Sequence, residues 1–363
     1  MNIIRYPPTQ NRSLRTWSAA DEYILRQFAD KDLSSKTMVI SNDRFGYLSC
    51  HLHHLNPFLV IERKSQQKSI EKNLERNGLK SELEKWLSPL GNIPEKTDLA
   101  ILSIPKSMDL FRLYLQQIHS GLTEHGTVLC SFMTRHFTPQ MLTIADELFE
   151  NADQSLAWKK SRILTLTGKK DVVKSGILDI ISYTFKTGTA ENLKQYYGVF
   201  SSGNIDYATQ FLLDYLELKA TDNLIMDLAS GNGVIGRAIQ HQKPEAELHL
   251  VDDSILAIES SKLNLEIKNT HFHWSDTLKT FKNNQFDLIV SNPPFHFGYE
   301  NNIEVSTRLF REAARVLKKE GRFICVANRH LNYKTHLEKH FGRSSAVAEN
   351  EKFVVYDSGR SLS

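Results

Sequence analysis

Cysteine is scarce in this sequence, and no long apolar run is present. The three cysteines, Cys50, Cys130 and Cys325, lie far apart and lack the paired spacing of disulfides or of a metal site. We therefore expect small buried thiols, no bound metal and a reducing cytoplasm around the protein. No stretch approaches the roughly 18 apolar residues of a membrane helix, and we expect neither a targeting segment nor a membrane span.

A strong excess of one charge is also missing. The 45 lysines and arginines nearly balance the 42 aspartates and glutamates, which gives a formal net charge of +3. This value does not by itself point to a polyanionic partner, although local basic clusters remain possible. Hydrophobic residues at 40% and charged residues at 24% are ordinary for globular proteins. A chain of 363 residues exceeds one typical core, so we expect two domains.

From Asn223 onward, short apolar runs alternate with stretches of helical periodicity. This alternation predicts a parallel α/β sheet with helices between its strands. The predicted strands are Leu224–Leu228, Glu247–Val251, His271–Trp274, Phe286–Ser291, Arg322–Ala327 and Lys352–Tyr356, and the predicted helices are Val234–His241, Ile255–Ile267 and Val305–Lys318.

The first half repeats this rhythm at an offset of about 190 residues. Residues 59–62 fall beside 250–253, residues 98–101 beside 287–290, and residues 126–130 beside 321–325. Aligned features in the same order favour a duplication over two unrelated α/β sheets. The fold class that we predict is therefore α/β, with two tandem Rossmann-like domains that cover residues 1–188 and 189–363.

The stretch between the two copies, residues 158–192, contains apolar and threonine-rich runs. Ile163–Leu166 and Ile177–Phe185 have the length and composition of short strands. We expect these two runs to pair as a hairpin that connects the domains.

The predicted strand Leu224–Leu228 runs into a glycine-rich turn. Gly231, Gly233 and Gly236 match a dinucleotide-binding fingerprint, and Asp252 follows about 20 residues later at the end of the second strand. Glycines let the backbone approach a ligand, and the acid can accept hydrogen bonds from ribose hydroxyls. The turn predicts a nucleotide-type cofactor, and a hydride-transfer enzyme remains an alternative at this point.

Asp227, just before the glycines, helps to choose between cofactors. A carboxylate there repels a pyrophosphate, whereas it attracts the cationic amino acid end of S-adenosylmethionine. Asp276, which follows the predicted strand His271–Trp274, has the position to accept a hydrogen bond from an adenine amino group. These acids favour S-adenosylmethionine as the cofactor.

The stretch Asn292-Pro293-Pro294-Phe295 comes directly after the strand that ends near Ser291, where α/β sheets present their ligands. The prolines fix φ and remove amide donors, so the carbonyls of Asn292 and Pro293 can point outward as acceptors. With the side-chain carbonyl of Asn292, they can hold both protons of an NH2 group and direct its nitrogen at a methyl donor. Phe295 would stack on a planar substrate.

This tetrapeptide decides between the two enzyme classes. Methyl transfer to an exocyclic amine uses it, whereas hydride transfer leaves it without a role. His296 follows the motif, but an attacking amine can lose its proton after the transfer, so we do not assign His296 to catalysis. The predicted catalytic residues are Asn292, Pro293, Pro294 and Phe295, and the predicted cofactor-binding residues are Asp227, Gly231, Gly233, Asp252, Asp276 and Asn292.

Further segments give the chain a family resemblance over nearly its whole length. They are residues 19–23 (AADEY), 157–160 (AWKK), 199–201 (VFS) with Asp206, and 327–331 (ANRHL). With the motifs above, the chain resembles the ribosomal RNA large subunit methyltransferase G family of bacterial guanine-N2 methyltransferases. The resemblance implies tandem class I methyltransferase domains, S-adenosylmethionine as cofactor and methylation of guanine N2 in 23S ribosomal RNA. It also suggests Phe200 and Asp206 as substrate-binding residues.

The same resemblance implies that the N-terminal copy is a degenerate domain for RNA recognition. The sequence agrees, because residues 40–46 contain one glycine where the second copy has three, and residues 103–106 replace the Asn-Pro-Pro-Phe element. Basic residues of this copy and its edge could contact phosphates. They are Lys106, Arg135, Lys159, Lys160 and Arg162.

Two positions depart from the family pattern. Ala229 stands where the family turn has glycine, and Ser202 replaces the arginine that usually follows Val-Phe-Ser. Alanine is small enough to fit the turn. The missing arginine removes a possible contact to substrate or cofactor, so the target nucleotide stays open.

Other substrates satisfy the same acceptors. Guanine N2 in 16S ribosomal RNA, adenine N6 and a protein glutamine amide all offer an NH2 group. A different class of function is a non-catalytic RNA-binding assembly protein, against which the intact cofactor motif argues. We expect 23S ribosomal RNA or a large-subunit precursor as the partner, no membrane partner, and a monomer.

Overall fold

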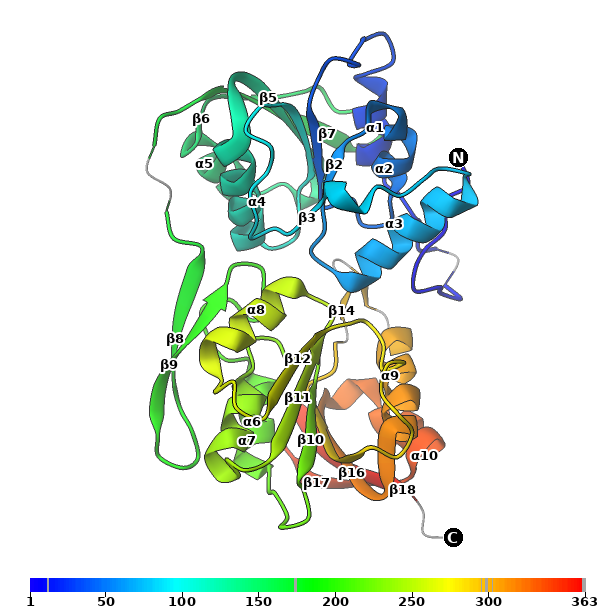
Figure 1. The fold of residues 1–363 in the computed structure, drawn as a ribbon, viewed down its shortest axis with the longest axis vertical. Helices are drawn as coiled ribbons and strands as arrows, with labels where there is room; N and C mark the ends of the chain where they lie inside the picture. The colour runs from blue at the N-terminus through cyan, green and yellow to red at the C-terminus, as the bar shows by residue number, and fades with distance from the viewer. Residues whose placement is uncertain (12, 173–174, 295, 298–299, 302, 361–363) are drawn as a thin grey trace. The chain divides into compact units, whose positions relative to one another are not determined.

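The computed structural model describes residues 1–363 apart from residues 12, 173–174, 295, 298–299, 302 and 361–363. The chain forms two compact units, Met1–Ile177 and Leu178–Ser363 (Figure 1). Within the described ranges, no helix is both long enough and apolar enough to span a lipid bilayer.

Each unit is built around one seven-stranded sheet. In the first unit the strand order is β3-β2-β1-β4-β5-β7-β6, and in the second it is β12-β11-β10-β13-β16-β18-β17. Counted along each half of the chain, these are the same topology. In both sheets five parallel strands are followed by two strands that pair antiparallel.

The strands of the first sheet are β1 (Met38–Ser41), β2 (Phe58–Val60), β3 (Trp86–Leu87), β4 (Thr97–Ser103), β5 (Leu122–Met133), β6 (Phe149–Gln154) and β7 (Ser161–Lys169). The strands of the second sheet are β10 (Leu224–Leu228), β11 (Glu247–Asp252), β12 (Thr270–Trp274), β13 (Phe286–Ser291), β16 (Leu317–Asn328), β17 (Gly342–Glu349) and β18 (Phe353–Arg360). Two short pairs complete the set: β8 (Leu178–Thr184) with β9 (Ala190–Tyr196), and β14 (His296–Phe297) with β15 (Glu300–Asn301).

Helices cover both faces of each sheet (Figure 1). Those of the first unit are α1 (Ala19–Arg26), α2 (Tyr47–His51), α3 (Lys64–Arg76), α4 (Met108–Gly121) and α5 (Gln140–Asp146), with short 3-10 turns η1 (His53–Leu55), η2 (Leu83–Lys85) and η3 (Thr134–His136). Those of the second unit are α6 (Tyr207–Tyr215), α7 (Val234–Gln242), α8 (Ile255–Asn264), α9 (Ile303–Val316) and α10 (Tyr333–Phe341), with η4 (Arg329–Leu331).

The core of the second unit has one apolar layer on each face of its sheet. Alternate strand residues point to opposite faces, so Ile225 packs with helices α6 and α7, whereas Met226 packs with α9 and α10. This arrangement buries the central strands on both sides and explains why their sequences read as continuous apolar runs.

The two halves share backbone detail as well as topology. One residue after the central strand, Asn42 and Ala229 adopt φ of 59° and 62°, and the helix that follows begins after Gly46 and Gly233, both at φ 82°. A carboxylate also ties the start of the central strand in each half. Asp98 accepts from the amide of Thr37, and Asp287 accepts from that of Leu224. These matched details support a duplication.

The predicted fold class, α/β with two tandem Rossmann-like domains, is confirmed by this topology. The predicted pairing of the linking hairpin is wrong. Ile163–Leu166 belongs to β7 and pairs with β5 and β6 of the first sheet, whereas Leu178–Thr184 pairs with Ala190–Tyr196. A β-hairpin forms between strands joined by a tight turn, and the 186–189 segment provides that turn.

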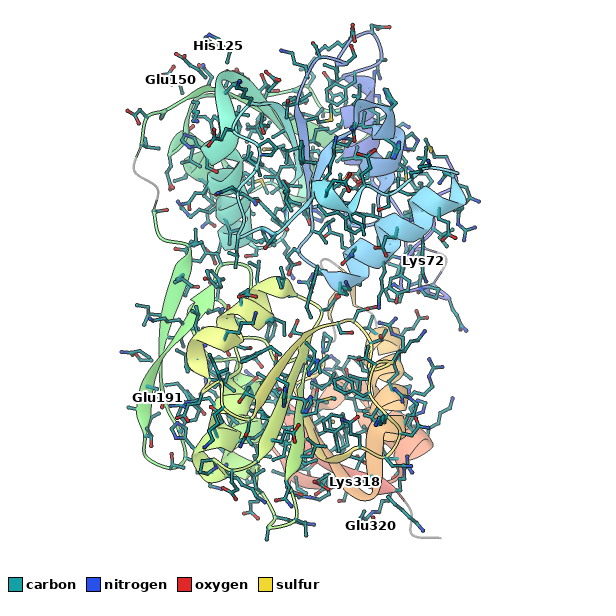
Figure 2. All side chains as sticks on the ribbon, in the orientation of Figure 1. Lys72, His125, Glu150, Glu191, Lys318 and Glu320 are labelled. Atoms are coloured by element: carbon teal, nitrogen blue, oxygen red, sulfur yellow. The ribbon has the colours of Figure 1, made fainter. Side chains whose placement is uncertain are left out.

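The β8-β9 hairpin belongs to the second unit, where an ion pair ties it to helix α7. Figure 2 labels Glu191 on β9, whose carboxylate accepts from Nη2 and Nε of Arg237 at 2.7 and 2.9 Å. The predicted boundary after residue 188 falls within this hairpin, and the assignment of separate roles to residues 1–188 and 189–363 stays a prediction.

The left-handed conformation of Ala229 leads to a stability prediction. Ala229→Gly relieves a strain of about 1–2 kcal/mol and costs about 0.5–1 kcal/mol in chain flexibility. We therefore expect a net stabilisation of at most about 1.5 kcal/mol in urea unfolding of the full chain. The matched control is Ala238→Gly within helix α7, which should destabilise by at least about 1 kcal/mol. Equal destabilisation by both changes would contradict the strain at Ala229.

Candidate active site

Asp227, Asp252 and Asn292 lie at the carboxyl ends of neighbouring strands of the second sheet. Strands β10, β11 and β13 are parallel neighbours, so their carboxyl ends emerge together. Leu228 at the end of β10 stands opposite Val251 on one side and Ser291 on the other. The hydroxyl of Ser291 donates to the carbonyl of Leu228 at 2.7 Å, which joins the glycine turn to the start of the Asn-Pro-Pro segment.

Asp227 is fully buried at the end of β10. Its Oδ2 accepts from the amide of Gly236 at 3.0 Å, and its Oδ1 has no hydrogen-bond partner within the described part of the chain. Burial raises the pKa of this carboxyl to about 7, and the charge of Asp252 acts in the same direction. A buried carboxylate with one unused oxygen is suited to receive a cationic ligand group.

The glycines of the turn have different tasks. A side chain on Gly233 would meet Leu265 Cδ1 at 2.5 Å, so this glycine allows helix α7 to pack against its neighbours. A Cβ on Gly231, which has φ of 55°, would meet nothing within 4 Å. Gly231 therefore faces open space, where its missing side chain lets a ligand approach the backbone.

Asp252 holds the turn from the next strand. Its Oδ2 accepts from the amide of Gly231 at 3.0 Å, and its Oδ1 accepts from that of Ser254 at 2.8 Å. A carboxylate has about four acceptor sites, so it can also accept from the hydroxyls of a ribose. Asp276 is buried after β12, and its carboxylate lies 3.8 Å from Nη2 of Arg308. The structure thus gives Asp276 an ion-pair partner that its sequence position did not indicate.

These residues fit the cofactor that the sequence suggests. The unused Oδ1 of Asp227 matches a positively charged group, and the open space at Gly231 leaves room for a ligand beside the turn. A pyrophosphate would place negative charge beside the buried carboxyl of Asp227. The geometry therefore favours a cationic nucleoside over a dinucleotide.

Asn292 is held in one orientation by helix α6. Its Nδ2 donates to Asp206 Oδ2 at 3.1 Å and to Thr209 Oγ1 at 2.9 Å. An ionised carboxylate only accepts hydrogen bonds, so the NH2 end of the amide must face Asp206. The other end, Oδ1, is thereby directed away from α6 as an acceptor.

The carbonyl of Pro294 is fixed by a second set of contacts. The hydroxyl of Ser306 donates to the carbonyl of Pro294 at 2.6 Å, and the hydroxyl of Tyr333 donates to Ser306 Oγ at 2.9 Å. Tyr333 is fully buried, and burial raises its pKa to about 12, so it stays a neutral donor. The Pro294 carbonyl is therefore occupied, which leaves the carbonyls of Asn292 and Pro293 as the predicted backbone acceptors. Phe295 lies outside the described residues.

The two remaining predicted residues of this half differ in exposure. Asp206 caps helix α6, where its Oδ2 accepts from the amides of Ala208 and Thr209 at 3.1 and 3.3 Å. It therefore positions Asn292 and the helix together. Phe200 is 58% exposed in the preceding turn, and Ser202, at the family arginine position, donates to Asp179.

The basic residues predicted in the first half lie at the carboxyl ends of the parallel strands of the first sheet. Lys106 follows β4, Arg135 follows β5, and Lys160 precedes the antiparallel β7, with its carbonyl accepting from the amide of Thr134 at 2.9 Å. Lys159 pairs with Glu22 at 3.0 Å, which makes it less available to a phosphate. Arg162 donates to Gln154.

The corresponding turn in the first half lacks the features of the site. Matched by the central strand and by the two left-handed residues, Ile40 occupies the place of Asp227, and Arg44 that of Gly231. An apolar side chain cannot attract a cation, and an arginine has a long side chain where glycine has none. The first turn thus keeps the two left-handed residues but has neither the carboxylate of Asp227 nor the glycine at 231.

Comparison with known proteins identifies both halves. The RLMG N-terminal domain matches residues 1–170, and the methyltransferase small domain matches residues 191–357. The chain is 31% identical to ribosomal RNA large subunit methyltransferase G of Shewanella denitrificans, over 99% of this chain and 96% of the relative. It is 30% identical to the protein of that name from Shewanella oneidensis, over 98% and 96% of the two chains.

A solved structure shares the fold over both halves. The T. thermophilus 16S rRNA N2 G1207 methyltransferase, in complex with AdoMet and guanosine, superposes with a TM-score of 0.79 at 20% identity, covering 97% of this chain and 94% of that one. This likeness supports the tandem arrangement of two domains of one fold.

The raised pKa of Asp227 predicts a pH dependence of stability. An acid with a pKa near 4 in the unfolded chain and about 7 in the folded one is protonated only in the folded state between these values, so the free energy of unfolding falls as pH rises. Without cofactor, the wild type should lose stability relative to Asp227→Asn by at most about 1.4 kcal/mol per pH unit between pH 4 and 7. The measurement is urea unfolding of both proteins at several pH values. If their free energies of unfolding change with pH in the same way, the pKa of Asp227 is not raised.

Proposed function

This chain belongs to the ribosomal RNA large subunit methyltransferase G family, and on that premise we propose that it methylates the N2 amine of a guanine in 23S ribosomal RNA. S-adenosylmethionine is the methyl donor in this proposal. The chain spans almost the full length of these relatives, so the proposal concerns the whole protein.

The observation that carries the proposal is the orientation of Asn292. Asp206 and Thr209 accept from both protons of its amide, which leaves Oδ1 as the end of the side chain that can accept from a substrate. In the proposal, Oδ1 and a backbone carbonyl of the Asn-Pro-Pro segment accept the two protons of an exocyclic NH2 group. They stand one strand away from the glycine turn, where a cofactor would lie.

The second half contributes to catalysis mainly by positioning. Asn292 Oδ1 and the Pro293 carbonyl hold the substrate amine, so that its nitrogen lone pair faces the methyl donor. As the nitrogen gains positive charge during the transfer, the fixed carbonyl dipoles stabilise it. The amine then releases a proton to solvent, and no protein base is required.

The cofactor supplies a methyl group activated by a positively charged sulfur. Asp227 Oδ1 would receive its ammonium group, Asp252 its ribose hydroxyls, and Asp276 its adenine amine. Gly231 would leave room for the chain of the amino acid, and Gly233 would allow the turn to pack beside it. Binding of a cation next to Asp227 favours the ionised carboxylate, which opposes the effect of burial.

The first half would contribute RNA affinity. Its turn has Ile40 and Arg44 in place of Asp227 and Gly231, so it would bind RNA without binding cofactor. Lys106, Arg135 and Lys160 would contact phosphates at the carboxyl ends of the parallel strands of the first sheet, and the exposed Phe200 of the second half would stack on a base.

The substrate, and with it the enzyme, would be found in the cytoplasm, and we expect a monomer.

The reaction is tested with methyl-labelled S-adenosylmethionine and ribosomal RNA from cells that lack this gene. Wild-type protein should produce N2-methylguanosine in 23S RNA, detected by nucleoside mass spectrometry, and Asn292→Ala should lower the rate at least about 100-fold, because the amine is no longer held. A urea-unfolding curve of Asn292→Ala that matches the wild type is the control for folding.

A different methylated product would change the proposed substrate. Label in 16S RNA would move the substrate to the small subunit, and N6-methyladenosine or labelled protein would replace guanine. Tight cofactor binding without methyl transfer to any of these would contradict the enzyme and favour an RNA-binding assembly protein.

Two substitutions distinguish the role of Asp206 in orienting Asn292 from its role as the N-cap of α6. Asp206→Asn and Asp206→Ser both keep a good N-cap for α6, but only the asparagine still reaches Asn292 with an acceptor oxygen. We expect kcat to fall about 10- to 100-fold in the serine variant and much less in the asparagine variant, with a similar KM for RNA. Equal kcat values would show that Asp206 serves only the helix.

A further inference from the structure

A cluster of ligating side chains lies at the opposite end of the same sheet. Glu247 and His249 alternate on β11, and His271 stands beside His249 on the neighbouring strand β12. Alternate residues of a strand share a face, and paired residues of neighbouring strands lie side by side, so all three side chains reach one patch. Figure 1 shows β11 and β12 next to one another, with β12 at the edge of the sheet.

The distances within this cluster match a metal site. His249 Nε2 and His271 Nε2 each lie 3.2 Å from the same oxygen of Glu247, and the three ligating atoms lie within 4.8 Å of one another. In a tetrahedral zinc site with bonds of about 2.0–2.1 Å, neighbouring ligand atoms are separated by about 3.3 Å. The two nitrogen-oxygen distances are close to that separation before any side chain moves.

A fourth side chain holds one of the ligands. His249 Nδ1 lies 2.9 Å from His273 Nε2, a distance that requires one shared proton. When the proton sits on His249 Nδ1, its Nε2 carries a lone pair toward Glu247, which is the form that binds a metal. The ring of His249 is also packed edge to face against Phe281 and Phe286, so its direction is fixed.

The exposure of the cluster also suits an ion. His249 is buried, whereas the side chains of Glu247 and His271 are about half exposed, at 53% and 49%. An ion can therefore enter from solvent, and water can complete its coordination. Two imidazoles and a carboxylate are the ligands of several zinc sites and also suit other late transition metals.

We propose that Glu247, His249 and His271 form a binding site for a divalent late-transition-metal ion such as Zn²⁺, which ties edge strand β12 to β11. The site lies at the amino ends of these strands, whereas Asp252 marks the carboxyl end of β11. The metal therefore stabilises the sheet and takes no part in methyl transfer. The expectation of no metal came from the cysteines, whose spacing carries no information about histidines on neighbouring strands.

Hydrogen bonds alone are the competing explanation. A protonated histidine can donate to Glu247, so the cluster would then be a pair of histidine-carboxylate contacts that bind no ion. The two explanations make different predictions. A metal site binds one ion per chain, and loss of His273, which only orients the ligand His249, weakens that binding. Hydrogen bonds alone bind no ion, with or without His273.

The test uses the full chain, free of any histidine tag and stripped with a chelator. Calorimetric titration with ZnCl2 should give one site per chain, and Co²⁺ should give the visible absorption of a four-coordinate ion. His271→Ala and Glu247→Gln should abolish this binding, and His273→Phe should weaken it about 10- to 100-fold. The control is His125→Ala, an exposed histidine on β5 of the first unit that Figure 2 labels.

The unfolding temperature gives an independent readout. A free Zn²⁺ concentration about 100-fold above Kd should raise it by about 5 °C or more in the wild type and in His125→Ala, but not in His271→Ala. The rate of methyl transfer to RNA should stay within about twofold on removal of zinc, so failure of one proposal is distinguishable from failure of the other. Equal zinc binding by wild type and His271→Ala, or no binding by either, would overturn the site.

Discussion

The turn after the central strand is the constraint on which both sheets depend. It has to pass through the left-handed region at its first residue and again where the next helix begins, and both halves satisfy this at Asn42 and Gly46 or at Ala229 and Gly233. The second glycine is required by packing, because a side chain at Gly233 would collide with Leu265. By contrast, the unbonded Oδ1 of Asp227 and the open space beside Gly231 are suited to a ligand. The duplicated fold could therefore keep its turn in both halves while one half lost its chemistry.

The sequence predicted the buried strands well and the edge strands poorly. Leu224–Leu228 and Phe286–Ser291 were identified with their observed bounds, because strands covered on both faces are continuous apolar runs. Strands β6 and β17 were missed, since most of their residues are polar or exposed at the antiparallel edge. Strand β3 has two residues and leaves no periodicity to detect. The hairpin was mispaired because apolar composition identifies a strand without identifying its partner.

Some residues of the candidate site could also be predicted from the sequence, and others could not. Asp227, Gly231 and Asn292 belong to contiguous motifs whose residue types are unusual enough to recognise. Thr209 orients Asn292, and Ser306 with Tyr333 fixes the carbonyl of Pro294. These three are common residue types that belong to no recognisable motif. Only the folded chain brings Thr209 to Asn292. The same holds for Glu247 and His271, which come together through strand pairing.

One aspartate links the start of a helix to the substrate acceptor. Asp206 closes the first turn of α6 and also orients Asn292, so the acceptor is in place only while that turn is formed. Helix ends open more readily than the centre of a buried sheet. Opening of that one turn would therefore release Asn292 from Asp206 and Thr209 together, without any change in the strands of either sheet.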